Sequence, residues 1–157
     1  MITEEVKKYI QQSVLCWLAT CNSKGEPNVS PKELFTYRDE QTLLIAHLAS
    51  PNSVKNIEEN NQVCVSFVDV FVQKGFKLKG IATLVSKSDP SYKERIKPLI
   101  DLYSDIYPIQ ALIEIKVVSV SPIIAPNYYL NKDTTEASQI ENAMKTYNVK
   151  PILKEES

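Results

Sequence analysis

The stretch of residues 42–70 limits the possible folds more than any other part of this chain. It opens with the apolar run 43–46, passes through Ser50-Pro51-Asn52-Ser53, and closes with the run 63–70, which is rich in β-branched residues. Apolar and β-branched runs of this length favour strands, and a serine followed by a proline favours a helix start. The stretch therefore predicts a strand, a short helix and a returning strand.

The predicted helix start has the composition of an anion site. Ser50 suits the N-cap, and Pro51 suits the first helical position, where its missing N–H is not needed. The amides of Asn52 and Ser53 then point out of the helix beside two hydroxyl groups, an arrangement suited above all to a phosphate. An ordinary capped helix has the same sequence, so the neighbouring residues must decide between the two interpretations.

Six runs have the composition of strands, and helices are inserted between them without regular alternation. We expect strands at 14–20, 28–37, 42–47, 63–70, 76–86 and 111–120, and helices after Thr3, over 51–60, from Asp89 to about Tyr107 and over 134–147. Regular alternation would indicate a parallel sheet, so its absence favours antiparallel pairing. Closure hides the edges of such a sheet, which predicts a small six-stranded barrel with flanking helices in one domain, 1–157.

Three positions predict irregularities in these elements. Gly80 lies inside the strand 76–86 and predicts a bulge or a close backbone approach. Pro98 lies within the third helix and should kink or split it. The pair Ser121-Pro122 should end the last strand.

Composition and charge exclude several classes of function. The chain has 157 residues, 43% of them hydrophobic and 24% charged, and its net charge of −1 favours neither nucleic acid nor an anionic membrane as a partner. No apolar run reaches membrane-spanning length and the first residues lack a signal-peptide core, so we expect a cytoplasmic protein. With three cysteines that form no close pair and a single histidine, His47, the chain is poorly supplied for a zinc site or a nucleophilic triad, and we predict no metal.

The order of the motifs resembles that of the FMN-binding split-barrel family related to pyridoxamine 5'-phosphate oxidase. The motifs are LAT, a turn with glycine and PNVSP; then LLIAH, SPNS and KNIEENNQVCVSF; then KLKGIATLV. They cover residues 14–122, and the likeness lies in their order and spacing. The resemblance implies a mainly β, largely antiparallel split β-barrel that forms a homodimer, with FMN in a groove between the two protomers.

The resemblance also implies a set of cofactor-binding residues. In this family the FMN phosphate is held by the second strand and by the loop and helix start after the third strand. Carried over to this chain, these positions are Ser30, Pro31, Lys32, Glu33, Ala46, His47, Leu48, Ala49, Ser50, Asn52 and Ser53. Lys32 would supply charge and the serines hydrogen-bond donors, while backbone groups near Pro31 and His47 would meet the polar edge of the flavin.

The chain departs from the family pattern at two places. Many relatives have Arg or Lys where this chain has Asn52 and Ser53, so its phosphate site is less cationic. The arginine and histidine ending of the parent oxidase is absent, which argues against vitamin B6 oxidation.

The resemblance implies an FMN-dependent oxidoreductase that passes electrons from a reduced nucleotide to a small acceptor, and no catalytic residue is assigned. Two alternatives remain open. One is a non-catalytic binding module for FMN or another anionic cofactor, such as haem or a deazaflavin, and the other is a structural or regulatory dimer that has lost its ligand. For single residues, we expect Trp17 in the core or at a dimer interface, and Glu114 and Lys116 on a solvated face.

Overall fold

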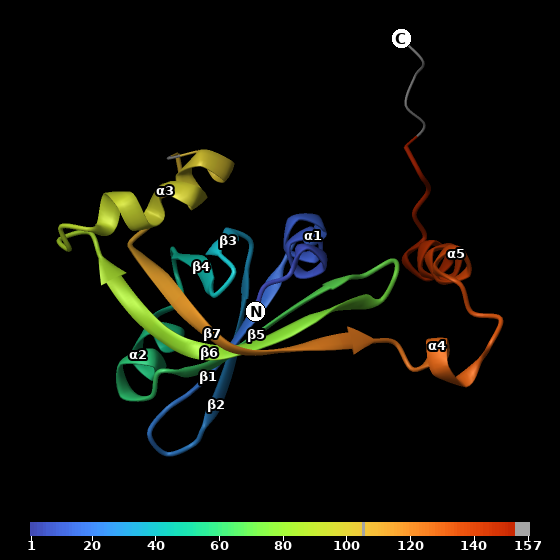
Figure 1. The fold of residues 1–157 in the computed structure, drawn as a ribbon, viewed down its shortest axis with the longest axis horizontal. Coiled ribbons are helices and arrows are strands. Elements are labelled where there is room, and N and C mark those ends of the chain that lie inside the picture. The colour runs from blue at the N-terminus through green and yellow to red at the C-terminus, as the bar shows by residue number, and fades with distance from the viewer. Residues whose placement is uncertain (105, 153–157) are drawn as a thin grey trace, which may run out of the picture.

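A computed structural model of the chain describes residues 1–104 and 106–152. One antiparallel sheet lies at its centre with helices around it (Figure 1). The strands are β1 (Cys16–Cys21), β2 (Pro27–Lys32), β3 (Phe35–Asp39), β4 (Thr42–His47), β5 (Gln62–Asp69), β6 (Lys74–Ser86) and β7 (Ala111–Ile124). The helices are α1 (Glu4–Gln12), α2 (Pro51–Glu59), α3 (Tyr92–Tyr103), α4 (Asn127–Leu130) and α5 (Glu136–Tyr147). The prediction of a mainly β, largely antiparallel fold with flanking helices is confirmed.

The number of strands differs from the prediction. The sheet has seven strands in the order β2-β1-β5-β6-β7-β4-β3, because the single strand predicted at 28–37 divides into β2 and β3. The break lies at Glu33 and Leu34, where the chain passes from one outer strand of the sheet to the other. The amide of Ala46 donates to the carbonyl of Leu34 over 2.9 Å and holds this crossing in place.

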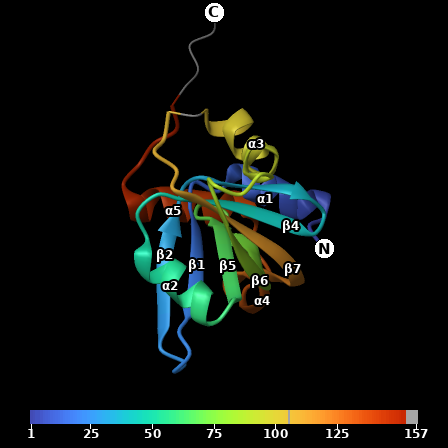
Figure 2. The same cartoon turned by 90° about the vertical axis from the view of Figure 1, so that its left-hand side faces the viewer.

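One continuous segment therefore supplies both edges of a curled sheet. In Figure 2, β4 runs across the direction of β1 and β2, as expected for strong curling. Within the described residues no ladder joins β2 to β3, so the sheet is not closed, and the expectation of a closed barrel is wrong in this respect. A short edge strand that contains Pro27 and Pro31 presents few backbone amides to another chain, which is a second way to protect an edge.

The core explains the continuous apolar run in the sequence of β4. All six of its residues are buried. Leu43 and Ile45 belong to the main core inside the curled sheet, while Leu44 and Ala46 belong to a second core beneath α3. A strand covered on both faces loses the alternation of polar and apolar residues that a half-exposed strand shows.

Two of the predicted irregularities have clear outcomes. The β6–β7 register shifts between Lys79 and Gly80, and a Cβ atom at Gly80 would lie 2.5 Å from the carbonyl oxygen of Lys116, so both a bulge and a close approach are present. The prediction that Pro122 ends the last strand is wrong. Beyond Lys116, β7 pairs with β6 alone, so the missing N–H of Pro122 removes no hydrogen bond to a second neighbour.

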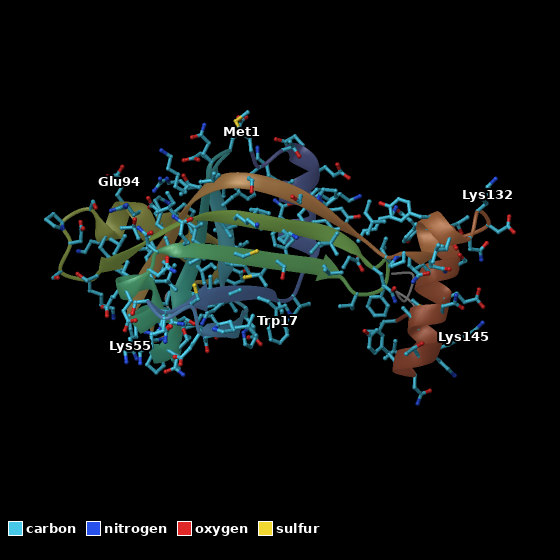
Figure 3. All side chains as sticks on the ribbon, turned by 90° about the horizontal axis from the view of Figure 1, so that it is seen from below. Met1, Trp17, Lys55, Glu94, Lys132 and Lys145 are labelled. Atoms are coloured by element: carbon cyan, nitrogen blue, oxygen red, sulfur yellow. The ribbon has the colours of Figure 1, made fainter. Side chains whose placement is uncertain are left out.

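The helix boundaries depend on local hydrogen bonds. Thr3 caps α1, its hydroxyl oxygen accepting from the amide of Val6. The third helix starts later than predicted, because Asp89 accepts hydrogen bonds from the amide and hydroxyl of Ser91 and so forms a turn; Pro98 lies inside this helix. Figure 3 shows α5 at the end of the molecule opposite α3, where Lys74 pairs with Glu136. None of the helices in the described residues is long and apolar enough to cross a membrane.

Substitution of Gly80 by alanine should destabilise the fold. The added methyl group would meet the backbone of β7, which cannot move without breaking the ladder, so we expect the free energy of unfolding to fall by about 2–3 kcal/mol. Urea unfolding followed by the fluorescence of Trp17, the single tryptophan, measures this. Lys77→Ala, at an exposed position of the same strand, is the control and should change stability by less than about 0.5 kcal/mol. Equal stability of the two variants would contradict the close approach.

Candidate functional site

A cavity of about 430 Å³ lies where β2 and β4 end. Most of the predicted cofactor-binding residues line it, joined by two that were not predicted, Leu34 and Tyr107. The predicted residues in its wall are Ser30, Pro31, Lys32, Glu33, Ala46, Leu48 and Ala49. Its lining is thus an apolar surface with one cation and one carboxylate, a composition typical of pockets for small molecules.

Lys32 is the most unusual group in the wall of this cavity. It is the last residue of β2 and only 8% exposed, and its Nζ donates to Ser30 Oγ over 3.0 Å and to Ser50 Oγ over 2.5 Å. No carboxylate lies within ion-pair distance of Nζ in the part of the chain that the structure describes, and burial lowers the pKa of Lys32. A buried ammonium group without a counter-ion is costly, and an anion in the cavity would compensate it.

His47 joins this cluster through Ser50. Its Nδ1 lies 3.2 Å from Ser50 Oγ, and its pKa is lowered by burial and by the charge of Lys32. Because a lysine can only donate, the oxygen of Ser50 accepts from Lys32. Ser50 then either donates its hydroxyl hydrogen to His47 Nδ1 or accepts from a protonated Nδ1, according to the tautomer of the ring. Ser50 therefore connects the charge of Lys32 with the single histidine.

The start of α2 agrees with the prediction in its backbone but not in its side chains. Ser50 occupies the N-cap and Pro51 the first turn, yet the hydroxyl of Ser50 makes no cap hydrogen bond because it serves Lys32 and His47. Asn52 is exposed. Ser53 is fully buried, and its oxygen accepts from Asn28 Nδ2 over 3.3 Å, so it faces β2. Neither residue lines the cavity.

The contacts that fix α2 were missed from the sequence. The side chain of Asn56 donates to Thr20 Oγ1 over 3.1 Å, and Asn28 reaches both Thr20 and Ser53. These polar groups join α2 to the β1–β2 hairpin, which lies beside it in Figure 2. A polar residue at an inward position of a strand, such as Thr20, and an asparagine three residues after Ser53 were the available signals.

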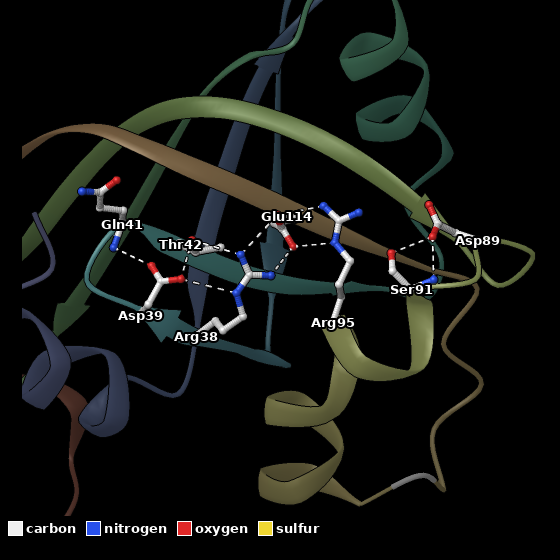
Figure 4. Close-up of polar contacts among 8 residues, drawn as sticks. All are labelled: Arg38, Asp39, Gln41, Thr42, Asp89, Ser91, Arg95 and Glu114. Carbon is white, nitrogen blue, oxygen red and sulfur yellow. Dashed lines mark hydrogen bonds and ion pairs between the residues drawn. The ribbon is translucent and has the colours of Figure 1, made fainter.

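A larger polar network lies away from this cavity, and its charged groups pair with one another. Glu114, expected on a solvated face, has a side chain only 14% exposed and accepts hydrogen bonds from Arg95 and Arg38 (Figure 4). The hydrogen bond from Arg95, together with that from Arg38, holds the pKa of Glu114 below its ordinary value. Since this carboxylate has two cationic partners, the cluster joins α3 and β3 to β7 and offers no unsatisfied charge. Among the described residues no group of three or more His, Cys, Asp or Glu could hold a metal ion.

Residues 2–137 match the family model for pyridoxamine 5'-phosphate oxidase. The chain belongs to this family. The solved structure of HupZ from Group A Streptococcus is 27% identical, with a TM-score of 0.66 over 80% of this chain and 99% of the other. An FMN-binding protein from Syntrophomonas wolfei has the same fold at 16% identity, with a TM-score of 0.64 over 78% of this chain and 86% of the other.

The name of a curated relative refers to haem. The protein named heme oxygenase HutZ, from Vibrio cholerae, is 24% identical over 109 residues, 65% of this chain. The match spans 61% of the length of HutZ. The names of these relatives thus refer to FMN in one case and to haem in another, so membership of the family alone does not identify the ligand of this chain.

Replacing Lys32 by methionine should stabilise the ligand-free protein. Methionine keeps much of the length and removes the buried charge, so we expect the free energy of unfolding at pH 7 to rise by about 1 kcal/mol. The pKa of Lys32 is lowered in the folded state, so the wild type gains stability as the pH rises from the folded-state pKa towards that of unfolded lysine. The advantage of the variant should shrink over that range.

Urea unfolding of both proteins across this pH range measures the difference. Lys55→Met, at an exposed position on α2, is the matched control and should change stability by less than about 0.5 kcal/mol. A loss of stability in Lys32→Met at pH 7 would mean that the fold itself compensates the ammonium group.

Proposed function

We propose that the protein binds FMN, with the cofactor phosphate at Lys32, Ser30 and Ser50. The observation that carries this proposal is the buried ammonium group of Lys32. This side chain lines a cavity of about 430 Å³ and has no carboxylate partner among the described residues. Seven of the eleven positions that the family resemblance implies line the cavity, and Ser50 contacts Lys32 from outside its wall. A phosphate would replace the missing counter-charge and accept hydrogen bonds from Nζ and from the hydroxyl groups beside it.

The residues around the cavity suit a flavin. The apolar side chains of Leu34, Ala46 and Leu48 would contact the ring system, and Tyr107 offers an aromatic face and a hydroxyl group. When bound, the flavin would supply the redox chemistry, accepting electrons from a reduced nucleotide and passing them to a small acceptor. The protein would hold the phosphate and exclude water from the ring, and His47, with its lowered pKa, would remain neutral near Lys32.

A second protomer would complete this site. The outward face of β1 and β2 carries large apolar side chains that stay partly exposed: Trp17 is 45% exposed and Val29 is 59% exposed. Trp17 lies opposite Pro31 in the β1–β2 register, and Pro31 also lines the cavity. The apolar face and the cavity are therefore continuous, so a second copy on this face would close the open side of the cavity.

The FMN proposal is tested by titration with FMN and riboflavin, which differ only in the phosphate. The visible spectrum and flavin fluorescence measure binding. In Lys32→Met we expect FMN to bind about tenfold to a hundredfold more weakly, because a charged hydrogen bond is lost, while riboflavin binding stays unchanged. Lys55→Met should bind both ligands like the wild type. If FMN and riboflavin bind with equal affinity to the wild type, the phosphate is not recognised at Lys32.

The same spectra test turnover and the alternatives. Bleaching of bound FMN by NADH or NADPH, followed by reoxidation with an acceptor, would support an oxidoreductase, whereas a flavin that resists reduction would support a binding module. A protein that ignores FMN and every anionic cofactor would support a dimer that has lost its ligand.

Haem is the second candidate ligand. The name of HutZ motivates it. Lys32, the single cation among the described residues of the cavity wall, would pair with one of the two propionates of haem. A shift of the Soret band of added haem relative to that of free haem, with no spectral change after addition of FMN, would favour this ligand.

Dimer formation predicts a strong effect at Trp17. An arginine at this position would place a charge in the apolar face. We therefore expect Trp17→Arg to sediment as a monomer where the wild type sediments as a dimer. Analytical ultracentrifugation gives the masses. Leu130→Arg, at an apolar position on α4 that is 83% exposed, should leave the mass unchanged. A monomeric wild type would refute the dimer.

A further inference from the structure

A second cavity, of about 350 Å³, adjoins the proposed cofactor site. It lies between α3 and the segment that leads into β7, and its apolar wall is formed by Tyr92, Ile96, Ile100 and Ile109. Tyr107 lines both cavities, so the two meet at this one side chain. Neither the sequence motifs nor the residues assigned to the cofactor account for the second cavity.

The rim of this second cavity is basic. Lys87, Lys93 and Lys97 line it, and no acidic side chain from residues 1–104 or 106–152 does. Lys97 pairs with Asp101, whereas Lys87 and Lys93 form no ion pair within residues 1–104 and 106–152. An apolar wall under a lysine rim is complementary to a ligand with an apolar body and one negative charge.

The wall of the second cavity is held in place by the fold. Arg95, on the same helix, donates from Nε and Nη2 to the carboxylate of Glu114 on β7, over 3.0 and 2.9 Å (Figure 4). At the end of α3, the hydroxyl of Tyr103 donates to the carbonyl of Phe35 over 3.0 Å. Leu99 is 1% exposed in the core below. These contacts fix α3 at both ends, so a ligand would meet a surface that is already formed.

We propose that this cavity binds an organic carboxylate with an aromatic or branched apolar body. Its apolar part would lie on Ile96, Ile100 and Ile109, and its carboxylate would meet Lys87 and Lys93 at the rim. The position beside Tyr107 makes this the substrate side of the flavin site, a role that rests on the proposed function. Binding of the carboxylate itself requires only the second cavity.

The experiment uses 2-naphthoate and its neutral analogue 2-naphthamide as probes of the full-length protein. Equilibrium dialysis gives both dissociation constants. We expect 2-naphthoate to bind about threefold to tenfold more tightly than the amide, because exposed ion pairs contribute modestly. Lys93→Glu should remove this preference, and Ile100→Glu should weaken both probes at least about tenfold by placing a charge in the apolar wall.

Lys132→Glu is the control for the change in charge. Lys132 lies at the opposite end of the molecule from α3, as its label and that of Glu94 in Figure 3 indicate, so this variant should bind both probes like the wild type. Equal binding of the acid and the amide would show that the lysines do not recognise the carboxylate, and this would overturn the proposal. Binding that Ile100→Glu leaves unchanged would also overturn it, because the probe would then bind elsewhere, with the groove lined by Trp17, Phe67 and Phe71 as the next site to test.

Lys32→Met separates this inference from the FMN proposal. The variant should lose tight FMN binding and keep the affinity of the wild type for 2-naphthoate. A wild type that ignores FMN but binds 2-naphthoate through Ile100 and Lys93 would retain the carboxylate site and overturn the cofactor. A protein that binds FMN but not 2-naphthoate would do the reverse.

Discussion

The double burial of β4 is the constraint on which the rest of the structure depends. A strand with apolar residues on both faces needs a cover on each side. The curled sheet covers Leu43 and Ile45, and α3 covers Leu44 and Ala46. This requirement explains why α3 is inserted between β6 and β7, and why its attachment to β7 through Arg95 and Glu114 is so well satisfied.

The candidate site follows from the place where this double burial ends. At His47 the chain leaves the core and turns into α2, and at the same rim β2 ends at Lys32. The hydrogen bond between Ala46 and Leu34 ties the two exits together, and Ser50 connects the two side chains. Because β4 is buried along its whole length and ends here, His47 and Ser50 lie next to Lys32, which is at the end of the edge strand β2.

Local sequence was enough to predict most elements but not the path between them. The strand at 42–47 was predicted with its observed bounds, and Gly80 revealed the bulge in advance, since both depend on neighbouring residues. The division of 28–37 into two strands could not be predicted, because it depends on which edge each half joins. The prediction that Pro122 ends the last strand was wrong for the same reason. The missing N–H is tolerated only because no second strand pairs with β7 at this position among the described residues.

Family likeness and local chemistry pointed to the candidate site, but the contacts of each side chain depend on tertiary structure. Ser50 has the sequence of a helix cap, yet its hydroxyl is taken by Lys32, and Ser53 turns towards Asn28. Tyr107 was not predicted, because it lies about 60 residues beyond His47 and reaches the cavity only through the placement of α3 and the segment that follows it.

Two poorly exposed charges show how architecture and function differ in this molecule. Glu114 has two guanidinium partners, so its charge is satisfied within the chain and holds α3 to the sheet. Lys32 has two hydroxyl partners, which can orient an ammonium group but cannot neutralise it. A buried charge that the fold leaves without a counter-ion costs stability, and an anion bound beside it returns that cost. The cluster on β3, β7 and α3 is therefore structural. At the ends of β2 and β4, by contrast, an anionic ligand would supply the counter-ion that Lys32 lacks among the described residues.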